Sequence, residues 1–389
     1  MKLSSKALAC GQSPMRKFHP YAVAAAAAGK KIYHLNIGQP DIHTPDALYD
    51  AIHNFRTPVL AYAASPGIPE LIEAIRKYYE NIGVGLDESD ILITTGGSEA
   101  LQIAANCLLD DGDEVIVPEP FYPNYHTFIT TAGGVIHPLH TKPEEGYFYA
   151  DRARIEACIT PKTKAIMITN PGNPTGTMMD REHLEELARF CCRHDLLVLA
   201  DEAYEQILYD GNRHISIAAL PGMWERTVTV QSFSKTYSMC GWRIGYIAAP
   251  ADLIRVIVRA HQTIAMNACA FGQMGALEAL EGPQDSLHQM LREFDRRRLL
   301  LYNGLQELGI PCSRPQAAFY LFPDISEFGM DSFAFAELLL EQYGVATVPG
   351  VEFGRNGENH LRISYATSYE DCQEGLRRIG QCVRDLRSK

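Results

Sequence analysis

Short apolar runs alternate with longer segments of helical periodicity over the central part of the chain. The apolar runs lie at Ile91–Thr95, Glu114–Val117, Lys164–Thr169, Leu196–Ala200 and Thr227–Gln231. Most of them are separated by segments in which apolar residues recur with the period of an amphipathic helix. Strands that are apolar on both faces are typical of a parallel sheet covered by helices. The pattern therefore predicts an α/β domain with a doubly wound sheet.

A different pattern begins near residue 284, where one long helix is predicted to leave this domain. The elements expected from there on are a helix at Gln284–Leu308, a strand at Phe319–Phe322, a helix at Ser332–Tyr343, a strand at Leu361–Ser364 and a final helix. Such a mixture indicates a smaller α+β domain. We expect a large domain at residues 46–283, and an N-terminal segment plus small domain at residues 1–45 and 284–389.

Composition and charge narrow the classes of function. The 35 Lys and Arg against 47 Asp and Glu give a net charge of −12, whereas a nucleic-acid-binding protein presents a concentrated basic surface. The longest apolar runs, such as Leu196–Ala200, fall far short of the roughly 18 residues that span a bilayer. We therefore expect neither a nucleic-acid partner nor a membrane helix.

Cysteine usage and the N-terminus bear on the compartment. The ten cysteines form no CxxC pair, which argues against a zinc site and favours reduced thiols. Basic residues precede the stretch Ala22–Ala28, which loosely imitates a signal peptide. That stretch is almost all alanine, however, and it ends in Gly29-Lys30-Lys31 as a helix would. We expect a cytoplasmic protein.

Polar residues follow several of the predicted strands, at the edge of an open parallel sheet where ligands bind. Asp201 comes directly after Leu196–Ala200, and a carboxylate buried there needs a cationic or donor partner unless it only caps a helix. Lys235 ends Ser232-Phe233-Ser234-Lys235, after the next strand. Either it is an ordinary surface lysine, or it is a desolvated amine that forms a Schiff base with an aldehyde.

Two further segments add donors to the same edge. The run Asn170-Pro171-Gly172-Asn173-Pro174-Thr175-Gly176 predicts a rigid loop that presents an Asn amide, although a simple connecting turn also explains its Pro and Gly residues. Gly96-Gly97-Ser98, between a strand and a helix, leaves backbone N–H groups at a helix N-terminus, which suits a phosphate. The sequence lacks the GxGxxG, GxxxxGK[ST], HExxH and GxSxG motifs of other common sites.

Taken in order, four of these motifs resemble the class I/II pyridoxal-phosphate aminotransferases of the aspartate aminotransferase fold. The motifs are Asn-Pro-Gly-Asn-Pro-Thr-Gly at 170–176, Asp-Glu-Ala-Tyr at 201–204, Ser-Phe-Ser-Lys at 232–235 and Gly-Trp-Arg-Ile-Gly at 241–245. The resemblance runs from about Leu35 nearly to the end of the chain. The fold that we expect is thus α/β, with a large domain whose mostly parallel seven-stranded sheet is covered by helices, and a smaller α+β domain.

The resemblance implies pyridoxal 5'-phosphate as cofactor and no metal. By similarity, Lys235 holds the cofactor as a Schiff base and shuttles the substrate proton, while Asp201 pairs with the ring nitrogen so that the ring accepts electrons. Tyr204 and Asn173 match the positions that hydrogen-bond its phenolic oxygen, and Tyr122 matches the aromatic that stacks on the ring. The positions that match phosphate contacts are Gly97, Ser98, Ser232, Ser234, Arg243 and Tyr62.

The resemblance also implies substrates and a partner. Arg362 matches the arginine that binds the substrate α-carboxylate, and Gly38 matches a backbone contact to the same group. Asn173 is also expected to contact the substrate, and Tyr204 is expected to act with Lys235 and Asp201 in catalysis. Tyr62 matches a tyrosine that reaches the phosphate from a neighbouring subunit, so a homodimer with shared active sites is expected. Some aspartate-specific relatives carry Lys where this chain has Ser98, which weakens an aspartate assignment. Phe18, Tyr21, Ile37 and Tyr320 are candidates for an apolar substrate pocket or for the core. Alanine, aromatic, branched and acidic donors all stay open.

The leading hypothesis is an aminotransferase that exchanges an amino group between an L-amino acid and a 2-oxo acid. A pyridoxal-phosphate-dependent carbon–sulfur β-lyase on the same fold is the alternative, because it shares every cofactor contact. A non-catalytic effector domain of a transcription regulator is a third reading. It needs a DNA-binding extension, and the roughly 30 residues before the resemblance show no helix-turn-helix pattern.

Overall fold

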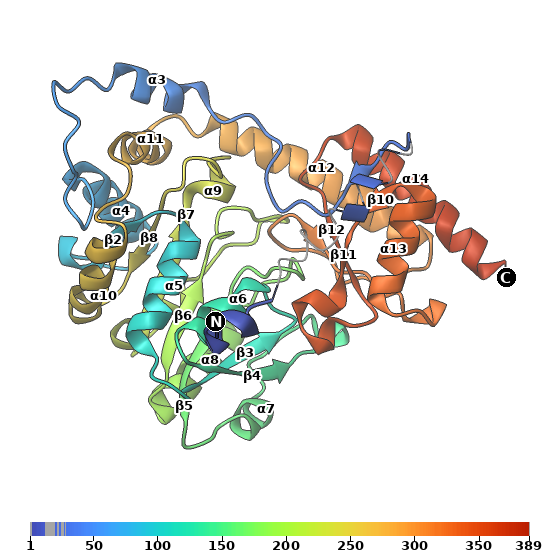
Figure 1. Cartoon of the computed structure of the whole chain (residues 1–389), viewed down its shortest axis with the longest axis horizontal. Coiled ribbons are helices and arrows are strands. Elements are labelled where there is room, and N and C mark those ends of the chain that lie inside the picture. The colour runs from blue at the N-terminus through green and yellow to red at the C-terminus, as the bar shows by residue number, and fades with distance from the viewer. Residues whose placement is uncertain (1, 12–19, 22, 25–26, 28, 389) are drawn as a thin grey trace.

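The computed structural model describes the chain apart from residues 1, 12–19, 22, 25–26, 28 and 389. A seven-stranded sheet forms its centre, in the order β2-β8-β7-β6-β5-β3-β4 (Figure 1). The strands are β2 (Ile91–Thr94), β3 (Glu114–Glu119), β4 (Val135–His140), β5 (Thr163–Thr169), β6 (Leu197–Asp201), β7 (Thr227–Ser232) and β8 (Gly245–Ala248). All neighbours pair in parallel except β8, which is antiparallel to both β2 and β7. The predicted α/β fold with a mostly parallel sheet is confirmed.

Helices cover both faces of this sheet, because alternate residues of its strands point to opposite layers. Leu199 of β6 packs in one cluster with Leu101 of α5, whereas Val198 and Ala200 pack in another with Leu187 of α8. The helices of this part are α3 (Asp46–Asn54), α4 (Pro69–Asn81), α5 (Gly97–Leu108), α6 (Asn124–Thr131), α7 (Arg152–Ala157), α8 (Arg181–His194), α9 (Phe233–Thr236), α10 (Ala251–Ile264) and α11 (Ala270–Glu281). A short helix, α1 (Ser5–Ala9), lies against α6.

Two strands of the sheet were not predicted. β4 is an edge strand that contains Pro138 and is mostly exposed or half-buried, so its sequence lacks a buried apolar run. β8 is only four residues long and begins at the last glycine of the Gly-Trp-Arg-Ile-Gly motif, so its sequence offers only a short apolar run. The short helix α9 between β7 and β8 provides no long crossover, so the two strands pair antiparallel.

The C-terminal part begins with the long helix α12 (Asp285–Glu307), which runs from the side of the seven-stranded sheet towards α13 and α14 (Figure 1). Its remaining elements are β9 (Tyr320–Leu321), α13 (Ser332–Tyr343), β10 (Val345–Ala346), β11 (Val348–Pro349), β12 (Leu361–Ser364) and α14 (Tyr369–Arg387). β11, β12 and β9 form an antiparallel sheet, and β1 (Tyr33–His34) pairs in parallel with β10. The division of the chain at 45/46 and 283/284 stays a prediction.

The helix predicted at Ser332–Tyr343 has the same bounds in the structure, because both ends carry local signals. The side chain of Asp331 accepts a hydrogen bond from the backbone N–H of Ala334, which caps the first turn. Gly344 ends the helix with φ +68°, a left-handed conformation that glycine adopts without a Cβ clash.

No helix in the described part of the chain is long and apolar enough to cross a bilayer. Phe18 and much of the Ala22–Ala28 stretch lie outside the described residues.

Candidate active site

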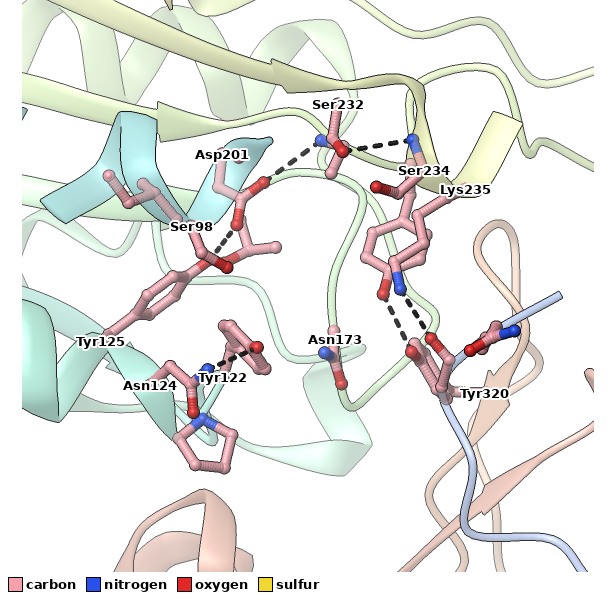
Figure 2. Close-up of a pocket in the computed structure, with 18 of the residues that line it drawn as sticks. Ser98, Tyr122, Asn124, Tyr125, Asn173, Asp201, Ser232, Ser234, Lys235 and Tyr320 are labelled. Carbon is pink, nitrogen blue, oxygen red and sulfur yellow. Dashed lines mark hydrogen bonds between the residues drawn. The ribbon is translucent and has the colours of Figure 1, made fainter. Parts of the chain in front are cut away.

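One cavity, of about 360 Å³, collects nearly all of the predicted site residues. It lies where β5, β6 and β7 end and α5 begins, and β9, β12 and the N-terminal segment close its other side (Figure 2). The predicted residues that line it are Gly38, Gly97, Ser98, Tyr122, Asn173, Asp201, Tyr204, Ser232, Ser234, Lys235, Arg243 and Arg362. Segments far apart in sequence thus meet at the carboxyl edge of the sheet, as open α/β folds favour.

Tyr62 is the one predicted residue that does not line this cavity. Its side chain is 82% exposed, and its neighbours Val59 and Leu60 are exposed as well. Its contact with a phosphate from a second subunit therefore stays a prediction. Of the proposed apolar pocket, Ile37 and Tyr320 line the cavity, whereas the ring of Tyr21 packs edge-on against Phe333.

Lys235 projects into the cavity from the short helix α9, directly after β7. Its Nζ donates a hydrogen bond to the carbonyl oxygen of Gly38 at 2.6 Å, across the cavity from the sheet (Figure 2). The amine is therefore not a surface group. The amine of a lysine in this position can act as a nucleophile towards a bound ligand and can carry a proton to or from it.

Asp201 is the last residue of β6 and is 8% exposed. Its Oδ2 accepts a hydrogen bond from the hydroxyl of Tyr125 at 2.7 Å, and its Oδ1 accepts one from the backbone N–H of Ala203 at 3.2 Å. Burial raises the pKa of Asp201, while these hydrogen bonds and the charge of Lys235 oppose the rise. The residues after it form turns and not a helix, so Asp201 is not a helix cap. It is a buried carboxylate that faces a cavity.

Tyr125 is a site residue that sequence analysis missed. It lies on α6, is completely buried, and joins Asp201 and Thr169 through its hydroxyl. Burial, followed by the charge of Asp201, raises its pKa, so the phenol stays neutral and donates. The sequence places it only three residues after Tyr122, and nothing local indicates that α6 turns it towards Asp201.

The N-terminus of α5 forms a cradle for an anion. Gly96 precedes the helix with φ +82°, and a Cβ at this position would lie 2.7 Å from Nη2 of Arg243. The guanidinium and the N–H groups of Gly97 and Ser98 therefore border the same end of the cavity. The hydroxyl of Ser232, which caps α9 by accepting from the N–H of Ser234, lines it too. This donor set suits a phosphate dianion.

Arg362 lies at the opposite side of the cavity, on β12, and is 6% exposed. It donates from Nη1 to Oδ1 of Asn173 at 3.2 Å and from Nη2 to the carbonyl oxygen of Asn36 at 2.9 Å. Its Nε is buried and has no hydrogen-bond partner. Because a buried donor without a partner is costly, this fork of N–H groups is suited to a ligand carboxylate.

Aromatic side chains form the walls between these groups. The hydroxyls of Tyr204 and Tyr320 lie 2.8 Å apart, and the guanidinium of Arg362 stacks 4.5 Å from the centroid of the Tyr320 ring. A Cβ at Gly38 would approach the Tyr320 hydroxyl to 2.6 Å, so a side chain there would displace the Tyr320 ring. On the other wall, Asn124 donates to the hydroxyl of Tyr122 at 2.7 Å. The cavity thus offers aromatic ring surfaces between the anion-binding cradle at the start of α5 and the N–H fork of Arg362, which suits a carboxylate.

Comparison with known proteins decides the family. The model of the family "Aminotransferase class I and II" matches residues 30–379. The chain belongs to the class I and II aminotransferases. This family depends on pyridoxal 5'-phosphate, and the assignment confirms the predicted transferase activity, in which an amino group passes between an amino acid and a 2-oxo acid.

Three relatives illustrate the similarity of this aminotransferase to others. It is 39% identical to an aspartate aminotransferase of Pyrococcus abyssi, over 92% of this chain and 94% of that protein. It is 37% identical to the aromatic-amino-acid aminotransferase 2 of Thermococcus litoralis, over 99% of each. The crystal structure of an aromatic aminotransferase from Pyrococcus horikoshii matches with a TM-score of 0.88 at 36% identity, and the match covers 94% of this chain and 99% of that one.

Proposed function

We propose that this aminotransferase binds pyridoxal 5'-phosphate in the cavity around Lys235. The observation that carries the proposal is the spacing of three complementary groups in one cavity: the anion cradle with Arg243, the buried carboxylate of Asp201, and the amine of Lys235. Asp201 is buried without an ion pair among the described residues, so a protonated ring nitrogen supplies the cation that it lacks. The residues present fit the cofactor.

When bound, the cofactor supplies an aldehyde carbon and a ring that withdraws electrons. We assign to Lys235 the covalent attachment and the transfer of the proton at the substrate α-carbon, because its amine lies in the cavity between sheet and small domain. Asp201 holds the ring nitrogen in its protonated form, and Tyr125 and the N–H of Ala203 hold Asp201 in place. Tyr204 and Asn173 are assigned to the phenolic oxygen, and Tyr122 to the ring face.

The phosphate is assigned to the N–H groups of Gly97 and Ser98, to the hydroxyls of Ser98, Ser232 and Ser234, and to Arg243. The substrate α-carboxylate is assigned to Arg362, whose free Nε and neighbouring Nη present a bidentate fork. The Gly38 backbone lies close by, on the same wall. With its carboxylate at Arg362, an amino acid would have its α-carbon between Arg362 and Lys235.

We also propose a cytoplasmic homodimer in which Tyr62 of each subunit reaches the phosphate of the other. The side chain of Tyr62 is exposed within an apolar stretch that includes Val59 and Leu60, which supports a contact with a second copy. All ten cysteines are free, which agrees with a reducing compartment.

We propose that the preferred amino donor is an amino acid with an apolar or aromatic side chain. Among the described residues that line the cavity, the cationic side chains are Lys235, Arg243 and Arg362, and all three are assigned to the cofactor or the α-carboxylate. Ile37, Val348 and Phe353 line the rest of the substrate side. The named relatives include enzymes for aspartate and for aromatic amino acids, so both classes have to be compared.

A donor screen tests the reaction class and the side-chain preference together. With 2-oxoglutarate and then pyruvate as acceptor, we expect tyrosine, phenylalanine or leucine to give a higher kcat/KM than aspartate. A higher value for aspartate would contradict the proposed preference. Release of pyruvate and ammonia from a cysteine conjugate, without any 2-oxo acid and faster than transamination, would instead favour the β-lyase alternative.

Replacement of Tyr125 by Phe tests the support of Asp201. The variant keeps the ring but removes the hydrogen bond to Oδ2, and a hydrogen bond to a charged group contributes about 1.5–3 kcal/mol. We expect pyridoxal 5'-phosphate to bind about ten- to hundredfold more weakly, as measured by equilibrium dialysis. Tyr147→Phe is the matched control, because Tyr147 is also a buried tyrosine but does not line the cavity. Equal affinities of wild type and Tyr125→Phe would show that Tyr125 does not support Asp201.

A further inference from the structure

A buried cluster of charged side chains lies on the far face of the sheet, directly behind Asp201. Strand alternation turns Asp201 towards the cavity and Glu202 to the other face, where Ala200 packs with the helix α8 layer. Glu202 is 2% exposed and Glu205 is 9% exposed. His214 comes from the loop after β6, and its side chain is 8% exposed. One ligand atom from each of the three residues lies within 4.8 Å of those of the other two.

Within this cluster, His214 and Glu202 form a close pair. Nε2 of His214 lies 3.1 Å from Oε2 of Glu202. Burial by itself lowers the pKa of His214, but the neighbouring charges of Glu202 and Glu205 outweigh it, and the net shift is upward. The imidazole is therefore protonated up to a higher pH than a free histidine, and it compensates the buried charge of Glu202.

Glu205 is the third member of the cluster. Burial raises the pKa of Glu205 to about 7, although the charge of His214 acts in the opposite direction. Below neutral pH it therefore carries a proton and no charge. The charges of the two glutamates also act on the neighbouring phenols of Tyr78, Tyr79, Tyr149, Tyr237 and Tyr246. Their pKa values are all raised by burial, so these phenols are neutral in the same range.

Glu202 connects the cluster to Asp201. The two residues are adjacent in the chain, and the negative charge of Glu202 adds to burial, the largest cause, in raising the pKa of Asp201. A proton on His214 offsets that charge. Because the carboxylate of Asp201 has to be ionised in order to pair with a protonated ring nitrogen, the state of a pair outside the active site acts on the group that holds the cofactor.

We propose that His214 and Glu202 are positioning residues that set the pH range in which Asp201 holds the cofactor, with His214 favouring the ionised state of Asp201 and Glu202 opposing it. The inference rests on the proposed role of Asp201 at the ring nitrogen. Neither residue lines the cavity, so neither is assigned a contact with cofactor or substrate.

The test measures the dissociation constant of pyridoxal 5'-phosphate by equilibrium dialysis between pH 4.5 and 8 for four proteins. These are the wild type, His214→Asn, Glu202→Gln and Glu205→Gln. Loss of the His214 charge makes Asp201 harder to ionise, so the pH below which affinity falls moves up by about one unit. Loss of the Glu202 charge moves this pH down by a similar amount. Glu205→Gln is the matched control, because Glu205 is also buried but is already neutral in the acid range. We expect the pH below which cofactor affinity falls to stay unchanged in this variant.

The proposal is supported if the pH below which cofactor affinity falls shifts in opposite directions in His214→Asn and Glu202→Gln. Simple disruption of packing would instead weaken binding in both variants. Shifts of the same sign, or no shift while the wild type binds normally, would overturn it. A stoichiometric metal ion in the purified wild type that is lost in all three variants would also overturn it, since the cluster would then be a metal site. If the wild type itself binds no cofactor, the proposed function fails first.

A readout on the cofactor-free protein covers the case in which a variant folds poorly. Because the pKa of His214 is raised on folding, its pairing with Glu202 stabilises the fold fully below about pH 6.5, and this contribution is lost as pH rises through the folded-state pKa. Urea unfolding should therefore show that His214→Asn loses more stability at pH 6 than at pH 9. An equal loss at both pH values would mean that His214 is not charged in the fold, which would also overturn the proposal.

Discussion

We expect Lys235→Ala to abolish transamination and the covalent attachment of the cofactor to the chain. The amine is the one nucleophilic nitrogen of the described residues that lies in the cavity between the anion cradle and the Arg362 fork, since the other cations there are guanidinium groups. Loss of proton transfer alone lowers turnover by about 10²–10⁴-fold, and loss of the covalent step adds to this. Turnover with the preferred donor is measured by coupled assay. Covalent attachment is measured as a mass increase after borohydride reduction.

Lys235→Arg separates the charge of this residue from its chemistry. Arginine keeps a cation that can donate towards the carbonyl of Gly38, but a guanidinium does not form the covalent link. We expect Lys235→Arg to bind the cofactor non-covalently and to be as inactive as Lys235→Ala. Turnover by either variant at more than a few per cent of the wild-type rate would show that Lys235 is not the catalytic amine.

We expect Arg362→Ala to lower kcat/KM for every amino donor, chiefly through KM. Loss of one partner of a buried, hydrogen-bonded charge pair costs about 2–5 kcal/mol, which corresponds to about 30- to several-thousandfold in kcat/KM. The free Nε and the Nη groups of Arg362 are the donors that a substrate carboxylate lacks after the change. Steady-state kinetics with the donor and the acceptor varied in turn measure both halves of the reaction.

Arg362→Lys distinguishes the fork from the charge. Lysine keeps the positive charge but presents a point donor, so we expect a loss smaller than in Arg362→Ala but still at least about tenfold. Binding of pyridoxal 5'-phosphate serves as the control, because Arg362 is assigned to the substrate and not to the phosphate. A large loss of cofactor affinity in both variants, with unchanged KM, would assign Arg362 to the cofactor instead.

Much of the site was predictable because the chain carries local signals for it. Asp201 and Lys235 each follow an apolar strand, and the carboxyl ends of parallel strands meet at one edge of a sheet. Gly97 and Ser98 lie between a strand and a helix, where backbone N–H groups are free to bind an anion. The order of these motifs indicated the family, and the family comparison confirms it.

Contacts between distant segments were not predictable in the same way. Lys235 meets the carbonyl of Gly38 across 197 residues, and Arg362 meets Asn173 across 189 residues. Tyr125 reaches Asp201 across 76 residues, and α6 carries no local signal for this contact. The antiparallel direction of β8 followed from a connection too short for a crossover, and the sequence analysis did not predict this strand.

The sequence by itself determined most of the elements, the chemistry of the cavity edge and the family, because strand periodicity, caps and motif order are local properties of the chain. Only the tertiary structure decided which groups face one another. It turned Asp201 and Glu202 to opposite faces of the sheet, left the Nε of Arg362 without a partner and brought His214 beside Glu202. These outcomes depend on packing between layers, and packing depends on many residues at once, so no single stretch of sequence contains them.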